Sequence, residues 1–139
     1  MSPTFHYLIM AEHSMFQKEL LAKLKDSGLT IGQPKVLDYL KDHDGTSQKD
    51  IARGCHIEPG TLTTLLNRME EAGLVERRMM NGNRRSLYVF LTDKGKEQLE
   101  LVTAAFSEME AEAFRGLSET ERKTFMDLFL RIYANTSRE

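Results

Sequence analysis

The feature that most constrains the fold of this chain is one change in the period of its apolar residues. Up to Gly73 these residues recur at helical spacing, about 3.6 positions per turn. In residues 75–79 and 86–91 the period is two, and the loop between the two runs holds an Asn-Gly-Asn step at 81–83. This pattern predicts a single β-hairpin within an otherwise helical chain.

Start and stop signals divide the region before the hairpin into helices. A long first helix is predicted from residue 5 to about residue 25. Pro34 fits the first turn of a second helix, and residues 42–47 are predicted to form a polar turn. Ser47 followed by Asp50 resembles a capping box, which would open a short third helix.

The fourth helix and the two helices after the hairpin follow from similar signals. Pro59 fits the first position of the fourth helix, and Gly73 ends it. Thr92 is the expected N-cap of a long fifth helix, and Ser118 with Glu121 forms a capping box that opens a sixth. The residues of the fourth helix that we expect to be buried are Leu62, Leu65, Leu66, Met69 and Ala72.

The order helix, short helix, turn, helix, hairpin is that of a winged helix-turn-helix. The predicted fold is mainly α with a small β-hairpin, in a single domain spanning residues 1–139. Residues 30–96 form the winged helix-turn-helix core, and residues 1–29 and 97–139 form N- and C-terminal dimerisation helices. These terminal helices carry more apolar surface than a small winged helix can cover, which favours a homodimer.

Composition excludes several other classes of protein. The single cysteine rules out an intramolecular disulfide, and no zinc-site spacing or glycine-rich phosphate loop is present. No metal or cofactor is therefore expected. No apolar run approaches the roughly 20 residues that a membrane helix needs, and MSPTFHYLIM lacks a basic leader. We expect a soluble, unprocessed cytoplasmic protein that does not contact a membrane.

Positive charge is concentrated on the hairpin although the whole chain is slightly acidic. The formal net charge is -2, but residues 45–96 hold nine basic and six acidic residues, whereas residues 97–139 hold five and nine. The hairpin arginines Arg78, Arg84 and Arg85 could follow a phosphate backbone or enter a minor groove. An equally simple alternative is that the hairpin arginines only pair with nearby acidic residues.

The exposed side of the fourth helix is rich in short hydrogen-bonding side chains. In a helix laid in the major groove, such early residues face base edges or phosphates. A merely solvated face is the alternative, but threonine is a mediocre helix former with no reason to recur there. Ser47 and Gln48, at the start of the preceding helix, are expected to contact only the DNA backbone. The candidate DNA-contacting residues of the fourth helix are Gly60, Thr61, Thr63, Thr64, Asn67 and Arg68.

The residues named so far resemble a known family. IARGCHIEPGTLTTLLNRMEEAGLVERR, followed by NGNRRSLYVFLTDKG, looks like the signature of the MarR family of bacterial transcription regulators, and the preceding LTIGQPKVLDYL is similar to its lead-in to the second helix. The resemblance implies a recognition helix at residues 59–72 and a wing at residues 77–86. It further implies a homodimer that binds a pseudopalindromic operator on double-stranded DNA, usually as a repressor. Many members of the family release DNA when a small-molecule effector or an oxidant acts on them.

Two positions depart from the family pattern. The family's wing commonly carries an aspartate two residues before an arginine, and here Asn83 precedes Arg85, so a charged brace becomes a neutral hydrogen bond. His56 replaces the usual small residue in the helix-turn-helix turn. Because histidine tolerates positive φ better than most residues, we expect a conformational role for His56.

Other chemistry is sparse. The resemblance places Cys55 where a core leucine commonly sits, so a buried structural thiol is expected rather than a redox sensor. An enzyme built on Cys55 and His56 remains an alternative, as does a helical protein-interaction module that uses a Met-rich surface without binding DNA. The first-helix residues that could line an effector pocket, or else form dimer core and surface, are His6, Tyr7, Met10, His13, Met15 and Phe16.

Overall fold

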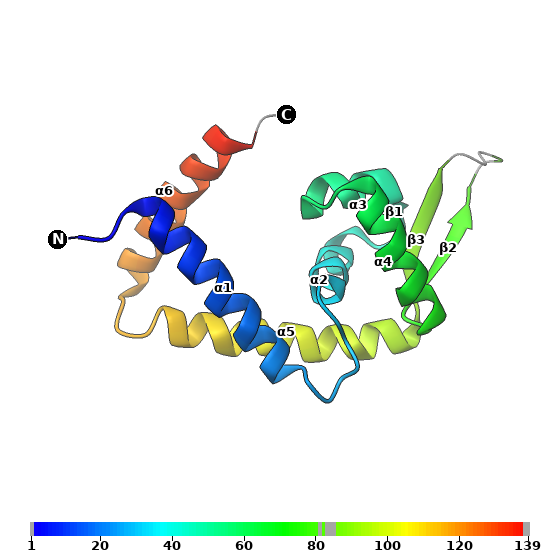
Figure 1. Cartoon of the computed structure of the whole chain (residues 1–139), viewed down its shortest axis with the longest axis horizontal. Helices are drawn as coiled ribbons and strands as arrows, with labels where there is room; N and C mark the ends of the chain where they lie inside the picture. The colour runs from blue at the N-terminus through cyan, green and yellow to red at the C-terminus, as the bar shows by residue number, and fades with distance from the viewer. Residues whose placement is uncertain (1, 81, 83–85, 138–139) are drawn as a thin grey trace. The chain divides into compact units, whose positions relative to one another are not determined.

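A computed structural model describes residues 2–80, 82 and 86–137 of the chain (Figure 1). The described elements are α1 (Phe5–Lys23), α2 (Gln33–His43), β1 (Thr46–Ser47), α3 (Gln48–Cys55), α4 (Pro59–Glu71), β2 (Val75–Met79), β3 (Leu87–Leu91), α5 (Asp93–Ala113) and α6 (Glu119–Thr136). The chain divides into two compact units, Met1–Phe106 and Ser107–Glu139, so the boundary falls within α5. The fold is mainly helical with a small antiparallel sheet, as predicted.

The predicted helix starts are confirmed by their capping contacts. Ser47 Oγ accepts a hydrogen bond from the backbone N–H of Asp50 at 3.1 Å, and it caps α3. Both hydrogen bonds of the Ser118–Glu121 capping box are present at the start of α6. Each cap satisfies a backbone donor that the helix itself leaves unpaired, which is why these residues begin helices.

The sheet has one strand more than the predicted hairpin. Its strand order is β1-β3-β2, and β1 pairs with β3 through Thr46 opposite Val89 and Ser47 opposite Tyr88. The prediction that residues 42–47 form a turn is therefore wrong at both ends, because α2 continues through His43 and β1 begins at Thr46. A strand of two residues is too short to display an alternating pattern, so periodicity could not reveal it.

The core of the first unit is formed mainly by α2, α3, α4 and the sheet. Ala72 was expected to belong to it, but this residue is exposed at the C-cap of α4. The chain leaves the helix at Gly73, whose φ is 78°, and the N–H of Leu74 bonds to the carbonyl of Met69. This hydrogen bond is that of a Schellman motif, in which the residue after the glycine makes the apolar contact. Leu74 therefore enters the core in place of Ala72.

Helix α1 is buried only in its second half. Leu20 and Leu24 are core residues, and the Phe16 ring stacks on Phe106 of α5 with 5.9 Å between centroids. The first half of α1 exposes large apolar side chains, among them Phe5, Leu8, Ile9 and Met10. This surface is consistent with the predicted excess of apolar area on the terminal helices.

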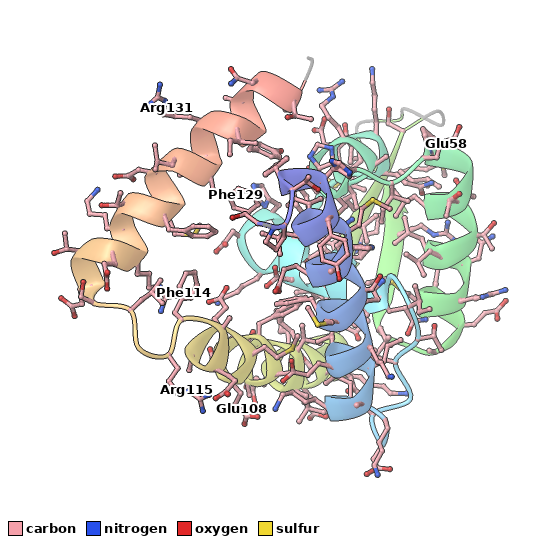
Figure 2. All side chains as sticks on the ribbon, turned by 60° about the vertical axis from the view of Figure 1, so that its left-hand side comes forward. Glu58, Glu108, Phe114, Arg115, Phe129 and Arg131 are labelled. Carbon is pink, nitrogen blue, oxygen red and sulfur yellow. The ribbon has the colours of Figure 1, made fainter. Side chains whose placement is uncertain are left out.

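The second unit contains the end of α5 and the whole of α6. The Phe125 ring contacts Phe114 and Phe129, and the guanidinium of Arg122 lies 4.3 Å from the centre of the Phe114 ring. Phe129 and Arg131 project to opposite sides of α6 (Figure 2). None of the described residues of α6 is buried. Within this unit, α6 thus leaves an apolar face without cover.

Candidate DNA-binding surface

Helix α4 presents a polar face opposite its buried stripe. Leu62, Leu65, Leu66 and Met69 are buried as predicted, and they fix which side of the helix faces outward. Proline at the first position leaves no intrahelical donor unpaired there, since its nitrogen carries no hydrogen. The candidate residues that the structure places together on the exposed side of α4 are Gly60, Thr61, Thr63, Thr64, Asn67 and Arg68.

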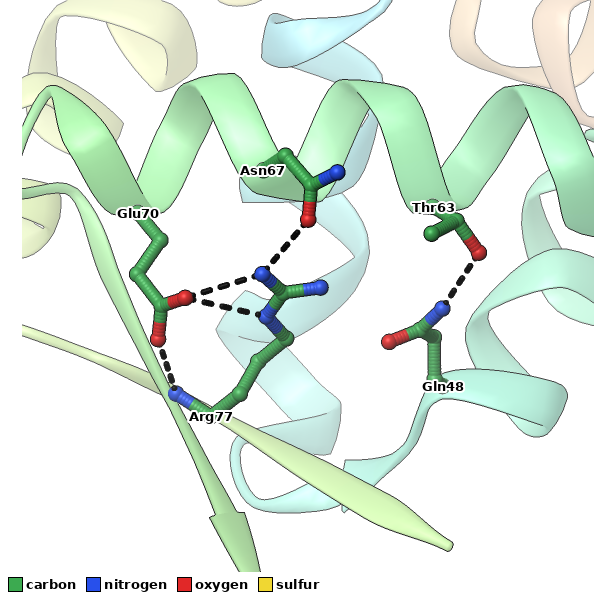
Figure 3. A network of polar contacts seen from close by, with 5 residues as sticks. All are labelled: Gln48, Thr63, Asn67, Glu70 and Arg77. Atoms are coloured by element: carbon green, nitrogen blue, oxygen red, sulfur yellow. Dashed lines mark hydrogen bonds and ion pairs between the residues drawn. The ribbon is translucent and has the colours of Figure 1, made fainter. Parts of the chain in front are cut away.

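The start of α3 is tied to this face by one hydrogen bond. Gln48 Nε2 donates to Thr63 Oγ1 at 2.8 Å (Figure 3). Ser47 and Gln48 are both half-buried, and Ser47 is engaged as the cap of α3. The two positions expected to contact the DNA backbone therefore also fix the helix-turn-helix geometry.

Two threonine hydroxyls of α4 donate hydrogen bonds to carbonyls of their own helix. Thr63 Oγ1 donates to the carbonyl of Pro59 at 3.0 Å, and Thr64 Oγ1 donates to that of Gly60 at 3.4 Å. A hydroxyl has one hydrogen, so each oxygen keeps only acceptor capacity toward other groups. Because Thr63 already accepts from Gln48, Thr64 has the more available acceptor of the two.

Arg77 of β2 forms the most connected polar cluster of the surface (Figure 3). Its Nε and Nη2 donate to Glu70 Oε1 at 3.2 and 2.8 Å, and its backbone N–H donates to Glu70 Oε2 at 3.0 Å. Nη2 also donates to Asn67 Oδ1 at 2.7 Å. These hydrogen bonds from Arg77 hold the pKa of the Glu70 carboxyl below its ordinary value.

The alternative interpretation of the hairpin charge is therefore correct for Arg77. Only 13% of its side chain is exposed, and its charge is offset by Glu70. The sequence carries no signal for this role, because Arg77 is one of four similar arginines in the hairpin region. The seven-residue separation of Glu70 and Arg77 joins a helix to a strand, and no single-element periodicity detects such a pair.

Arg78 differs from its neighbour in exposure. It pairs with Glu76 at 3.3 Å, but both side chains are more than half exposed. Its guanidinium also lies 4.3 Å from the centre of the Phe90 ring. Exposed ion pairs contribute about 0–1 kcal/mol, so exchange of Glu76 for a phosphate costs little. Arg84, Arg85 and Asn83 lie outside the described residues.

The predicted effector residues lie along α1. His6, Met10 and His13 are exposed and share one side of the helix, since they are four and three positions apart. His6 Nε2 lies 3.4 Å from Thr4 Oγ1. Phe16 continues the same side and stacks on Phe106.

Cys55 and His56 are placed for structural roles. Cys55 is buried, and burial raises the pKa of its thiol to about 11. This direction is opposite to what a nucleophilic thiolate requires. His56 has a φ of 54°, and its backbone N–H caps α3 by donating to the carbonyls of Ala52 and Arg53, as its conformational role predicts.

The described part of the chain lacks a metal site and a membrane-spanning helix. Residues 2–80, 82 and 86–137 contain no group of three or more histidine, cysteine, aspartate or glutamate residues able to hold a metal ion. None of the helices that these residues form combines the length and apolar character needed to span a bilayer.

Comparisons with known proteins agree with this geometry. The family model described as "MarR family" matches residues 29–87. The HTH-type transcriptional repressor MdtR of Bacillus subtilis is 31% identical over 111 residues, which cover 78% of this chain and 72% of MdtR. An HTH-type transcriptional repressor of Mycobacterium tuberculosis is 27% identical over 119 residues, 86% of each chain. The crystal structure of an S. aureus MepR–DNA complex superposes with a TM-score of 0.88 at 27% identity, covering 97% of this chain and 99% of MepR.

An outward-facing helix, held by the helix before it and by a β-hairpin after it, defines a winged helix-turn-helix protein. Together with the comparisons, it identifies the chain as a DNA-binding transcription regulator. The chain belongs to the MarR family. Its relatives are named transcription regulators rather than enzymes, which disfavours the Cys55–His56 hypothesis and the interaction-module alternative.

Proposed function

We propose that the chain is a repressor that binds a pseudopalindromic operator as a homodimer, with one α4 helix in each half-site. The observation that carries the proposal is the exposed polar face of α4, which is fixed by Gln48 near its start and by Arg77 near its end. Two relatives are named transcriptional repressors, which supports repression rather than activation. MepR, which has been crystallised with DNA, supports the mode of binding.

The second copy of this chain is the proposed occupant of the apolar face of α6. Helices in proteins owe most of their stability to tertiary packing, and α6, an 18-residue helix with no buried residue, has little of it. We assign residues 30–96 to DNA binding and residues 1–29 and 97–139 to dimerisation within one domain of residues 1–139. The exposed apolar residues of α6 are Phe125, Met126, Leu128, Phe129, Leu130, Ile132 and Tyr133.

Selection of bound duplexes from a random pool tests the proposal. We expect an inverted repeat whose half-sites are about one helical turn apart, roughly 34 Å. Light scattering at micromolar concentration should give the mass of two chains, and Leu128→Glu should reduce it to one. A monomeric wild-type protein would contradict the homodimer. Binding that does not weaken with added salt would contradict the phosphate-dependent mode.

A small-molecule effector is the second part of the proposal. Exposed His6, Met10 and His13 together with Phe16 offer imidazole, thioether and ring surfaces on one side of α1, which suits a planar apolar ligand with a polar group. A compound library screened by thermal unfolding, with cytoplasmic metabolites included, is the test. A true effector should stabilise the wild type, release the operator and lose both effects in Met10→Asp. Retention of both effects in this variant would remove these residues from the site.

A further inference from the structure

The contact between Arg77 and Asn67 fixes which end of the Asn67 amide faces outward. Arginine carries five N–H donors and no acceptor, so only the amide oxygen can face it. Arg77 Nη2 lies 2.7 Å from Asn67 Oδ1, and Figure 3 shows the amide nitrogen on the side away from Arg77. The orientation follows from the chemistry of the partner, since an amide turned the other way would set donor against donor.

Arg77 is itself unable to turn away. Three of its N–H groups donate to the two oxygens of Glu70, and its side chain is mostly buried. Both guanidinium donors converge on Glu70 Oε1 while the backbone N–H of Arg77 donates to Oε2, so Glu70 fixes the side chain and the main chain of Arg77 together. Glu70 and Asn67 are about one turn apart on α4, so the guanidinium contacts side chains from two successive turns of the same helix. The orientation of Asn67 is thus set before any DNA is bound.

Asn67 lies on the same exposed face as Thr63 and Thr64. Its side-chain nitrogen therefore offers two donors there, while its oxygen is directed at the wing. An asparagine that reads adenine needs both ends of the amide, the oxygen for the N6 amino group and the nitrogen for N7. The oxygen keeps a second lone pair, but it is directed at Arg77 and not at the exposed face, so this paired contact to adenine is disfavoured. Guanine instead presents two acceptors, N7 and O6, in the major groove.

We propose that Asn67 is a specificity-determining residue that reads guanine through donors alone, and that Arg77 is the positioning residue that imposes this choice. The proposal rests on the proposed function, because it requires the exposed face of α4 to enter the major groove. It gives Arg77 a role distinct from phosphate neutralisation.

Three proteins compared in a random-duplex selection test the base preference. The wild type should enrich guanine at one position of each half-site, and Asn67→Ala should lose that enrichment alone. Asn67→Asp keeps an acceptor toward Arg77 but has no donor, so it should prefer cytosine, whose N4 amino group donates. On the wild-type site, Asn67→Asp should bind about five- to a hundredfold more weakly. Adenine at the Asn67-dependent position in the wild type, or no preference there, would overturn the proposal.

A double variant tests the positioning role of Arg77. Glu70→Gln combined with Arg77→Met removes both charges together, so no charge is left without its partner. The freed amide should then admit adenine beside guanine at the same position, with other positions unchanged. A selection identical to that of the wild type would show that Arg77 does not set the preference.

A readout without DNA separates this inference from the proposed function. In chemical denaturation, Asn67→Ala should destabilise the wild type more than it destabilises the Glu70→Gln/Arg77→Met double variant, because only in the wild type does the amide oxygen accept from Arg77. Equal losses in the two backgrounds would mean that the amide oxygen does not face the guanidinium, and would overturn the inference even if the operator is found. If the wild type binds no duplex at all while this difference holds, the proposed function and the base reading fail, and only the amide orientation stands.

Discussion

Gln48 Nε2 donates to Thr63 Oγ1 at 2.8 Å, and this hydrogen bond joins the first residue of α3 to the exposed face of α4. It fixes the relative rotation of the two helices at the end where α4 would meet DNA. Gln48→Ala should therefore lower the free energy of unfolding by about 0.5–1.5 kcal/mol. Urea denaturation measures the change, with Lys49→Ala, at the next and exposed position, as the control. Equal effects of the two substitutions would contradict the assigned role of Gln48.

Thr64 should read a base, whereas Ser47 should not. Thr64→Ala is expected to weaken operator binding by about 1 kcal/mol more than binding to a scrambled duplex. Ser47→Ala should weaken both equally and should also destabilise the protein by about 0.5–2 kcal/mol, because it removes the α3 cap. Titrations at one fixed salt concentration decide between these outcomes. An equal loss for Thr64→Ala on both duplexes would make Thr64 a phosphate contact.

Thr64 has two groups that could contact a base, its hydroxyl oxygen and its methyl. Thr64→Val keeps the methyl, and Thr64→Ser keeps the hydroxyl. Because the hydroxyl hydrogen bonds to Gly60, an oxygen contact must accept from a base amino group. Loss of affinity in Thr64→Val alone would indicate that contact, and loss in Thr64→Ser alone would indicate packing on a thymine methyl.

Arg78 should contribute to the salt dependence of binding. Arg78→Ala is expected to flatten the slope of log affinity against log salt by about one unit if the residue contacts a single phosphate. The control is Arg115→Ala, which breaks a comparable exposed ion pair, with Glu112, in the second compact unit. The same measurement applies to Arg85, which lies outside the described residues. A slope unchanged in Arg78→Ala would remove this residue from the interface.

The Glu70–Arg77 pair should make stability depend on acid pH. Because Arg77 lowers the pKa of Glu70 in the folded state, unfolding raises the affinity of this carboxyl for protons. Its contribution is fully present above the ordinary value of 4.5 and is lost as the pH falls below it, through the depressed folded pKa. Urea denaturation between neutral pH and pH of about 3 should show a shallower decline for Glu70→Gln than for the wild type. Parallel curves would contradict the lowered pKa.

Cys55 should be unreactive in the folded protein. With a thiol pKa of about 11, the thiolate is scarce at neutral pH, and burial blocks access to it. Alkylation followed by mass spectrometry should show no modification before unfolding and complete modification in denaturant. Rapid alkylation of the folded protein would revive the hypothesis of a redox or catalytic role.

The helices, the hairpin and the outward face of α4 could be predicted from the sequence, because each depends on local periodicity or on a cap. Ser118 with Glu121 and Pro59 are such local signals, and both fall where expected. The missed features are contacts between elements. Strand β1 depends on its register with β3, and the burial of Arg77 depends on a glutamate on another element. The positive φ of His56 could be predicted only through the family resemblance, since a histidine does not by itself require this conformation.

The middle position of β3 in the sheet has a mechanical consequence. β3 pairs with β1, which leads into α3, and with β2. Arg77 of β2 forms an ion pair with Glu70 of α4. Only Thr92 separates β3 from α5, and a side chain on Gly95 would come within 2.0 Å of the carbonyl of Leu74, so this joint is tightly packed. A small rotation of the first turn of α5 would therefore be transmitted to β3. Because β3 pairs with both β1 and β2, α3 and the wing would move together.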